Sequence, residues 1–183
     1  MFISIKDLEV RKLDFDEQLR PGQIDLGADY AQRGPLHTTG SATLVEEHRG
    51  GKNVVKDIRL VGDLQATVEM RCARCLESVT RAITQDFDLL YRPLGADAGA
   101  AETHLAEADV EIGYYQGGGI LLEDVLKEQV LLAAPLKVVC SEECQGFCSI
   151  CGANRNQQSC NCVVEAPDPR WSALNEIRDK LGK

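Results

Sequence analysis

Eight cysteines are the residues of this 183-residue chain whose type and spacing best suit chemistry. They are arranged as Cys72-x2-Cys75, a gap of 64 residues, and then Cys140-x3-Cys144-x3-Cys148-x2-Cys151-x8-Cys160-x-Cys162. Two-residue spacing lets both sulfurs of a turn point at one ion, and four thiolates fill the tetrahedral shell of a structural Zn²⁺ site. In the cytosol clustered thiols stay reduced and more often bind metal than pair as disulfides. The pattern therefore predicts zinc, with iron as a minor alternative.

The eight thiols divide naturally into two sites of four ligands each. The local site consists of Cys148, Cys151, Cys160 and Cys162, and Gly152 is free to take the positive φ that a Cys-x-x-Cys turn tends to need. The second site would join Cys72, Cys75, Cys140 and Cys144, because loop-closure cost grows only logarithmically with length. The rival arrangement is a single zinc held by the six C-terminal cysteines, with the first two left as a reduced pair.

All-cysteine coordination favours a structural metal over a catalytic one. The three histidines, His37, His48 and His104, lie far from the cysteines in sequence, and no HExxH or Gly-x-Ser-x-Gly motif is present. We therefore expect no enzyme and no small-molecule substrate. A dithiol redox role for Cys72-Ala-Arg-Cys75 stays open, because Arg71 and Arg74 would lower a thiol pKa.

The segments around the first cysteine pair have the pattern of strands. Residues 1–93 are expected to form an antiparallel β-region, an open sheet or a partly closed barrel, that opens with a strand over Phe2–Val10. Gly50-Gly51 between two strand-like runs indicates a hairpin. Residues 78–93 read as a further strand ended by Pro93, so the Cys-x-x-Cys falls at a turn.

The rest of the chain completes an α+β fold. Residues 94–119 are expected to form an acidic flexible loop, and residues 120–134 a central helix that Pro135 ends. Residues 135–183 form the cysteine-rich, zinc-binding segment. They close with a short helix that begins near Asp168 and is anchored by Trp171.

Composition excludes several classes of protein. Hydrophobic residues make up 44% of the chain and the net charge is −9, which excludes wholesale disorder and a generic histone-like polyanion binder. Most of the excess acid lies in residues 93–136, which carry eight acidic and one basic side chain. No apolar run could span a membrane, and the start lacks the pattern of a secretory signal. We expect a cytoplasmic protein without a membrane partner.

Three segments together resemble a known family. They are MRCARCLESV, LLAAPLKVVCSEECQGFCSICGANRNQQSCNC and DPRWSAL. Their combined pattern is similar to the YceD family, described as large ribosomal RNA subunit accumulation proteins. The resemblance implies a small non-enzymatic accessory factor for synthesis, processing or stability of 23S rRNA, with that RNA, its precursor or pre-large-subunit particles as partners. Members that lack much of the C-terminal cluster imply that the second metal site is a stabilising addition.

Basic residues near the first cysteine pair are candidate RNA contacts. They are Arg71, Arg74, Arg81, Lys56 and Arg59. Such a patch would touch phosphates, while the acidic middle segment limits indiscriminate RNA binding. The alternative is that these are ordinary solvated sheet residues. A competing function is an escort for a basic ribosomal protein, held by the acidic stretch from Asp97 to Glu128 without contact to RNA.

Overall fold

The computed structural model describes residues 1–49, 54–96 and 112–163. The chain divides into two compact units, Met1–Cys140 and Ser141–Lys183. Unit 1 contains all the helices and strands that the structure describes. The expected C-terminal helix around Trp171 lies outside the described residues.

A six-stranded mixed sheet forms the body of unit 1, with strand order β2-β4-β5-β6-β7 and β3 paired to β5. The strands are β2 Leu13–Leu19, β3 Tyr30–Gln32, β4 Leu36–His48, β5 Val54–Arg71, β6 Ser78–Pro93 and β7 Ile112–Tyr115. β4 and β5 pair antiparallel from His48↔Val54 onward, as the hairpin prediction requires, although the Gly50-Gly51 turn lies outside the described residues. The described sheet path is open, not closed into a barrel.

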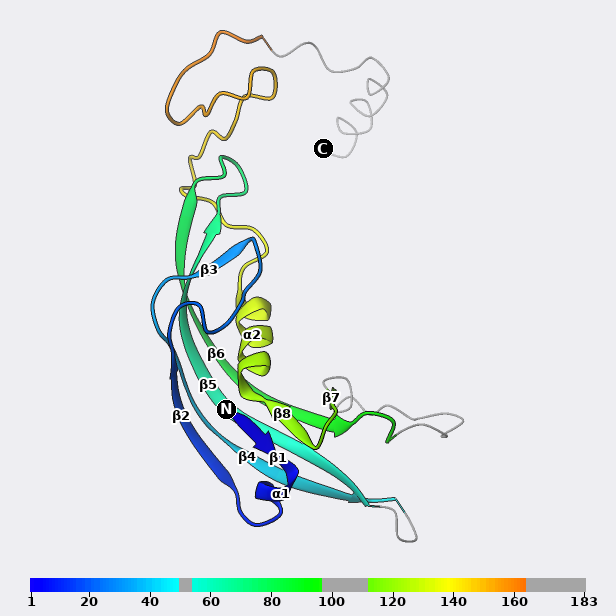
Figure 1. Cartoon of the computed structure of the whole chain (residues 1–183). Helices are drawn as coiled ribbons and strands as arrows, with labels where there is room; N and C mark the ends of the chain where they lie inside the picture. Colours follow the sequence, from blue (N-terminus) through cyan, green and yellow to red (C-terminus); the bar gives the residue numbers. More distant parts are fainter. Residues whose placement is uncertain (50–53, 97–111, 164–183) are drawn as a thin grey trace, which may run out of the picture. The chain divides into compact units, whose positions relative to one another are not determined.

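A row of two phenylalanines and two glycines crosses the middle of this sheet. The register pairs Phe15 with Gly40, Gly40 with Gly62, and Gly62 with Phe87. A Cβ on Gly40 would lie 2.6 Å from the Phe15 ring, and one on Gly62 would lie 2.9 Å from the Phe87 ring. The aromatic rings thus take the space above the glycines. Sheets use this arrangement where they curve, and Figure 1 shows that the strands of this sheet are curved.

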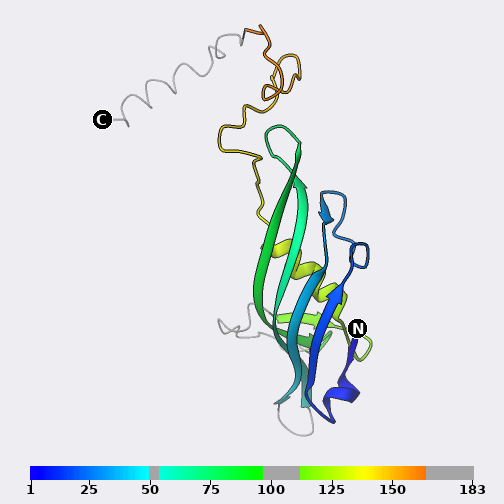
Figure 2. The same cartoon turned by 90° about the vertical axis from the view of Figure 1, so that its left-hand side faces the viewer.

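Helix α2, Leu122–Ala133, packs against one face of the sheet (Figures 1 and 2). It buries Leu122, Val125, Leu126, Gln129 and Val130. The sheet contributes the fully buried side chains of Ile58, Leu60, Leu64 and Val68 from β5. This apolar layer fixes β5 and β6, the two strands that lead into and out of the first cysteine pair.

The structure differs from the sequence-based expectations at the start of unit 1 and at the start of α2. The expected strand over Phe2–Val10 is correct only for β1, Phe2–Ser4, because the Ser4 hydroxyl caps helix α1, Ile5–Leu8, by accepting a 3.2 Å bond from the Asp7 N–H. β1 pairs with β8, Gly119–Leu121, so α2 begins at Leu122 and not at residue 120.

The expected acidic loop 94–119 contains a strand that sequence reasoning missed. β7 pairs parallel with β6 from Leu90↔Ile112 to Pro93↔Tyr115, which makes the sheet mixed and not purely antiparallel. Residues 97–111 lie outside the described residues. Among those described, no helix is long and apolar enough to cross a membrane.

Candidate metal centres

The first cysteine pair lies in the turn that joins β5 to β6. The last strand pair is Arg71↔Ser78, and the turn closes through bonds from the Cys72 N–H to the Glu77 carbonyl at 2.8 Å and from the Leu76 N–H to the Cys72 carbonyl at 2.9 Å. Leu76 has φ 59 and is the one non-glycine residue of the described chain with positive φ. The turn therefore holds a left-handed residue directly after its second cysteine.

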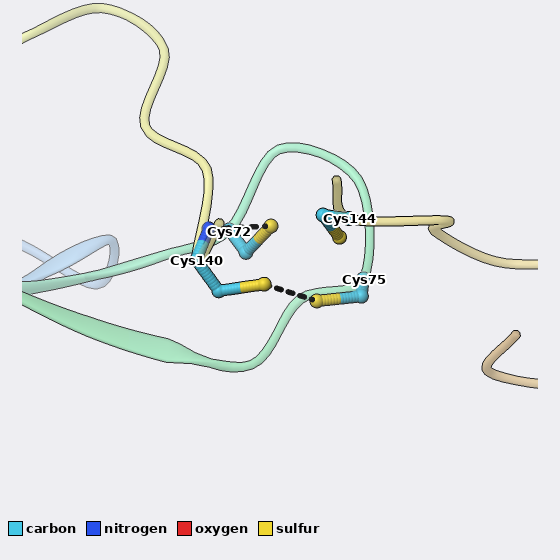
Figure 3. A group of neighbouring side chains, drawn as sticks. All are labelled: Cys72, Cys75, Cys140 and Cys144. Atoms are coloured by element: carbon cyan, nitrogen blue, oxygen red, sulfur yellow. Dashed lines mark hydrogen bonds between the residues drawn. The ribbon is translucent and has the colours of Figure 1, made fainter. Parts of the chain in front are cut away.

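The segment that follows α2 brings a third thiol to this turn. The Ala73 N–H donates to the Val138 carbonyl at 2.8 Å, and the Cys140 N–H donates to the Cys72 sulfur at 3.4 Å. The Cys75 and Cys140 sulfurs are 3.6 Å apart (Figure 3). Arg81 on β6 adds a 3.2 Å bond to the Val139 carbonyl. Three thiols of unit 1 thus converge although 64 residues separate Cys75 from Cys140.

The Cys72 thiol has an environment that favours its anion. It is fully buried, and burial raises its pKa, but N–H groups of Arg74, Cys140 and Cys75 point at the sulfur and lower the pKa to about 6. Thiolate is the form that binds metal. The sulfurs of Cys72, Cys75, Cys140 and Cys144 all lie within 4.8 Å of one another, so the structure contains the four-cysteine group expected from the sequence.

A second group of four thiols lies within unit 2. The sulfurs of Cys148, Cys151, Cys160 and Cys162 also lie within 4.8 Å of one another. The Cys148 turn is closed by bonds from the Gly152 N–H to the Cys148 carbonyl at 2.9 Å and from the Cys148 N–H to the Ala153 carbonyl at 2.8 Å. Gly152 has φ 72, which confirms the sequence-based reason for a glycine there.

The electrostatics of the second group are compatible with a bound cation. N–H groups of Cys151 and Ile150 lower the pKa of Cys148 to about 6. Cys162 shows the opposite shift, because its hydrogen bond to Cys151 and the nearby thiols raise its pKa to about 12. Four thiolates so close together repel one another, so the sulfurs do not all ionise readily without a counter-charge. A divalent cation at their centre would stabilise every thiolate.

Asn156 is a site residue that sequence reasoning missed. Its side-chain N–H donates to the Cys144 sulfur at 3.3 Å, and its side-chain carbonyl accepts from the Gln145 N–H at 2.7 Å. It therefore orients a thiol ligand in the way that outer partners orient metal ligands. The signal was available, because Asn156 is the last residue of the Cys-Gly-x-Asn-x-Asn motif that carries the family resemblance.

Thiolate donors in groups of four fit Zn²⁺ in the chemistry of the donor set. Zn²⁺ takes four such ligands tetrahedrally, and a complete thiolate set leaves no coordination position for water or substrate. The residues that would hold the metal are the four of each group, and a bound ion would supply charge neutralisation and cross-linking of distant segments. The structure is compatible with two metal centres, and the identity of the ion is a proposal.

The candidate RNA contacts do not lie together. Arg71 ends β5 and Arg74 lies in the cysteine turn, both exposed. Arg81 is nearby on β6, and its guanidinium also bonds the Thr80 carbonyl at 3.1 Å. Lys56 and Arg59 lie toward the opposite end of β5, and the twelve steps along the strand from Arg59 to Arg71 span about 40 Å of extended chain.

The two distant cations are paired with carboxylates. Arg59 makes a two-point ion pair with Asp88, at 2.8 and 2.6 Å, and Lys56 pairs with Glu9. These hydrogen bonds raise the pKa of both cations. By contrast, Arg71 borders a hollow of about 300 Å³ that Tyr30 and Lys137 also line. Lys137 and Tyr30 are thus neighbours of Arg71 that the sequence did not single out.

The fold and the two thiol groups define a class: a curved, mostly antiparallel sheet protein with a cysteine pair in its β5–β6 turn and a compact four-cysteine module. Residues 60–178 match the family described as "Large ribosomal RNA subunit accumulation protein YceD", and the chain belongs to that family. The match begins within β5 and covers all eight cysteines.

Individual relatives are distant. The chain is 26% identical over 147 residues to "Large ribosomal RNA subunit accumulation protein YCED homolog 1, chloroplastic" of Arabidopsis thaliana, covering 69% of this chain and 46% of the relative. It is 25% identical over 133 residues to an uncharacterized protein of Mycobacterium leprae, covering 69% and 55%. The chain therefore spans about half the length of these curated relatives. No solved structure matches.

Proposed function

We propose that this protein is an accessory factor that supports the accumulation of large-subunit rRNA, 23S rRNA or its precursor, in the cytoplasm. Family membership is the observation that carries the proposal. In this role the protein binds RNA or a pre-large-subunit particle and performs no catalysis. Both thiol groups hold structural zinc, because four thiolates complete the coordination of the ion.

The surface that best suits RNA is the end of unit 1 that carries the first cysteine pair. Arg71 and Arg74 are exposed there, and Lys137 lies with Arg71 and Tyr30 around one hollow. Cations contact phosphates, and an aromatic side chain gives a face on which a base can stack. The hydrogen-bonded turn holds these groups on a rigid strand end.

The test is ultraviolet crosslinking in cells, followed by sequencing of the attached RNA. Enrichment of large-subunit rRNA is expected for the wild type, with a loss of about tenfold or more for the Arg71→Glu/Arg74→Glu variant, since each lost phosphate contact weakens binding. Arg11→Glu/Lys12→Glu is the matched control, because it makes the same charge change at exposed positions between α1 and β2. Equal crosslinking of both variants, with both folded, would reject this surface.

A second candidate function is an adaptor for a basic protein. The observation that favours it is an acidic groove on unit 1, between β6 and α2, that contains none of the basic residues described above. Particle association that survives nuclease treatment but not high salt, without RNA crosslinks, would favour the adaptor over direct RNA binding.

A further inference from the structure

No described strand covers the outer edge of β6 along most of its length. β6 runs over Ser78–Pro93, and among the described residues β7 covers this edge only from Leu90 to Pro93. The backbone carbonyl of Asp86 accepts a 2.8 Å hydrogen bond from the side-chain amide of Gln85 on the same strand. An open strand edge offers a row of backbone donors and acceptors to an added strand.

A groove runs beside this open edge. Its first part is a hollow of about 470 Å³ between β6 and α2, lined by Gln85–Leu89 on one side and by Glu128, Gln129 and Leu132 on the other. A second hollow of about 420 Å³ adjoins it, sharing Tyr91 and Glu128. Figure 1 shows α2 lying along β6. An extended peptide would have backbone partners on one wall and a helix on the other.

Gln129 is the feature that points to a ligand. Its side chain is only 6% exposed, it lines the first hollow, and among the described residues it has no hydrogen-bond partner. Among the described residues the fully buried side-chain atoms without a partner are Gln32 Oε1 and Glu123 Oε2, so the Gln129 carboxamide still reaches the solvent of the hollow and is accessible to a ligand. The carboxamide has one donor group and one acceptor, the same pair that a peptide unit presents.

The charge of the groove selects the occupant. Asp86, Asp124 and Glu128 line it and make no ion pair with any described residue, and neither lining includes a described lysine or arginine. Leu132, which is 72% exposed, adds an apolar contact at the same site. Nucleic acid would be repelled. The chain's own segment 97–111 has the wrong charge for this acidic groove as well, since it carries five acidic side chains and no lysine or arginine.

We infer that the groove between β6 and α2 binds an extended basic peptide, which adds as a strand to β6 around Gln85–Leu89 and bonds the Gln129 carboxamide. Side chains of the added strand would alternate between two directions. One set would face Glu128 and Leu132, and the other would face the side of the sheet that carries Asp86. This inference deepens the adaptor candidate by naming its binding surface. The loss of RNA crosslinking by Arg71 and Arg74 variants is a separate result, so the two proposals can fail independently.

The experiment uses the full-length, metal-loaded protein and a fluorescein-labelled peptide of alternating lysine and valine, followed by fluorescence anisotropy at low and moderate salt. Gln129→Leu is expected to weaken binding about three- to tenfold, the range for one lost hydrogen bond. Asp124→Asn/Glu128→Gln should weaken it about fivefold or more and flatten the salt dependence. Asp14→Asn/Asp16→Asn on β2 is the control with the same charge change and should leave affinity within about twofold.

Backbone recognition is tested by a peptide with alternate N-methylated amides, which keeps its charge but cannot add as a strand. It should lose most of its binding, and the unmethylated peptide should slow amide hydrogen exchange at alternate residues of β6 between Ala82 and Leu89. Equal affinity for the two peptides, or equal effects of the groove and β2 variants, would overturn the inference. Displacement of the peptide from wild type by polyuridylate, but not from the groove variants, would show an RNA site there and would overturn it too.

Discussion

Leu76 has a left-handed backbone conformation that the first cysteine turn imposes. It follows Cys75 with φ 59, and Gly152 follows Cys151 with φ 72, so the two turns need a left-handed residue at the same place. In unit 2 that residue is glycine, which takes this conformation without penalty. In unit 1 it is a leucine, for which the left-handed conformation costs about 1–2 kcal/mol.

Replacing Leu76 with glycine is therefore expected to stabilise the protein. The gain should be about 0.5–1 kcal/mol in the free energy of unfolding, because relief of strain exceeds the added entropy of the unfolded chain. The measurement is urea unfolding of the metal-loaded protein. Ala73→Gly in the same turn is the control and should destabilise by a similar amount, since φ at Ala73 is not positive. A loss of stability for Leu76→Gly would contradict the assignment of strain.

A second prediction about a single residue concerns Asn156, whose side-chain N–H donates to the Cys144 sulfur at 3.3 Å. Asn156→Ala should raise the dissociation constant of the metal bound through Cys144 by about 10–100-fold. Competition with a chromogenic chelator would report this as earlier release of one metal of two. Gln158→Ala is the control, because Gln158 bonds the Asn154 carbonyl through its backbone N–H, at 3.0 Å, and not through its side chain. Unchanged release would mean that Asn156 only shapes the loop.

At the scale of elements, the Phe-Gly-Gly-Phe row is the most constrained part of the sheet. A Cβ on Gly40 would lie 2.5 Å from the Val61 carbonyl oxygen and 2.6 Å from the Phe15 ring. The first neighbour is backbone and cannot move by itself. Gly40→Ala is expected to lower the free energy of unfolding by about 1–3 kcal/mol, the usual cost of overpacking.

Denaturant unfolding would measure this loss of stability. A second variant separates its two causes, the contact with the Phe15 ring and the contact with the Val61 carbonyl. In a Phe15→Leu background the ring is gone, so the additional loss from Gly40→Ala should be smaller, although the contact with Val61 remains. Fully additive losses would show that the ring does not fill the space above Gly40.

At the scale of the whole molecule, metal binding should make stability depend on pH. Cys72 and Cys148 have pKa values lowered to about 6, against about 8.5 for a free thiol. A thiol pKa that is lower in the folded state contributes stability that is present above about pH 8.5 and lost as the pH falls through about 6. Protons also compete with the metal for the same sulfurs, which adds to this loss.

The difference in melting temperature between metal-loaded and chelator-treated protein should therefore be large at pH 8 and shrink toward zero below about pH 6. Comparing the two forms at each pH removes the contribution of ordinary carboxylates. Metal release followed by atomic absorption should fall in the same pH range. A difference that stays constant from pH 8 to pH 5 would contradict thiolate coordination.

Sequence by itself determined the features that depend on local spacing. The alternation and the Cys-x-x-Cys turn predicted β6 over residues 78–93, and the structure has the strand over that range. The cysteine spacing also predicted the group of Cys148, Cys151, Cys160 and Cys162, because short spacings bring sulfurs together whatever the surrounding fold. The other group was predicted by joining the two remaining pairs across a 64-residue gap, and the fold brings those pairs together. Chain order and side-chain chemistry suffice for such inferences.

Tertiary structure alone decided what depends on strands meeting across long separations. β7 was missed because a four-residue parallel strand has too few residues to show a period, and its pairing with β6 is set by the fold. The expected basic patch is split because an 18-residue strand places Arg59 and Arg71 near opposite ends of unit 1. The open edge of β6, the unpartnered Gln129 and the acidic groove exist only once α2 packs beside that strand. No local pattern encodes which strand edge stays uncovered, since that depends on where every other element ends.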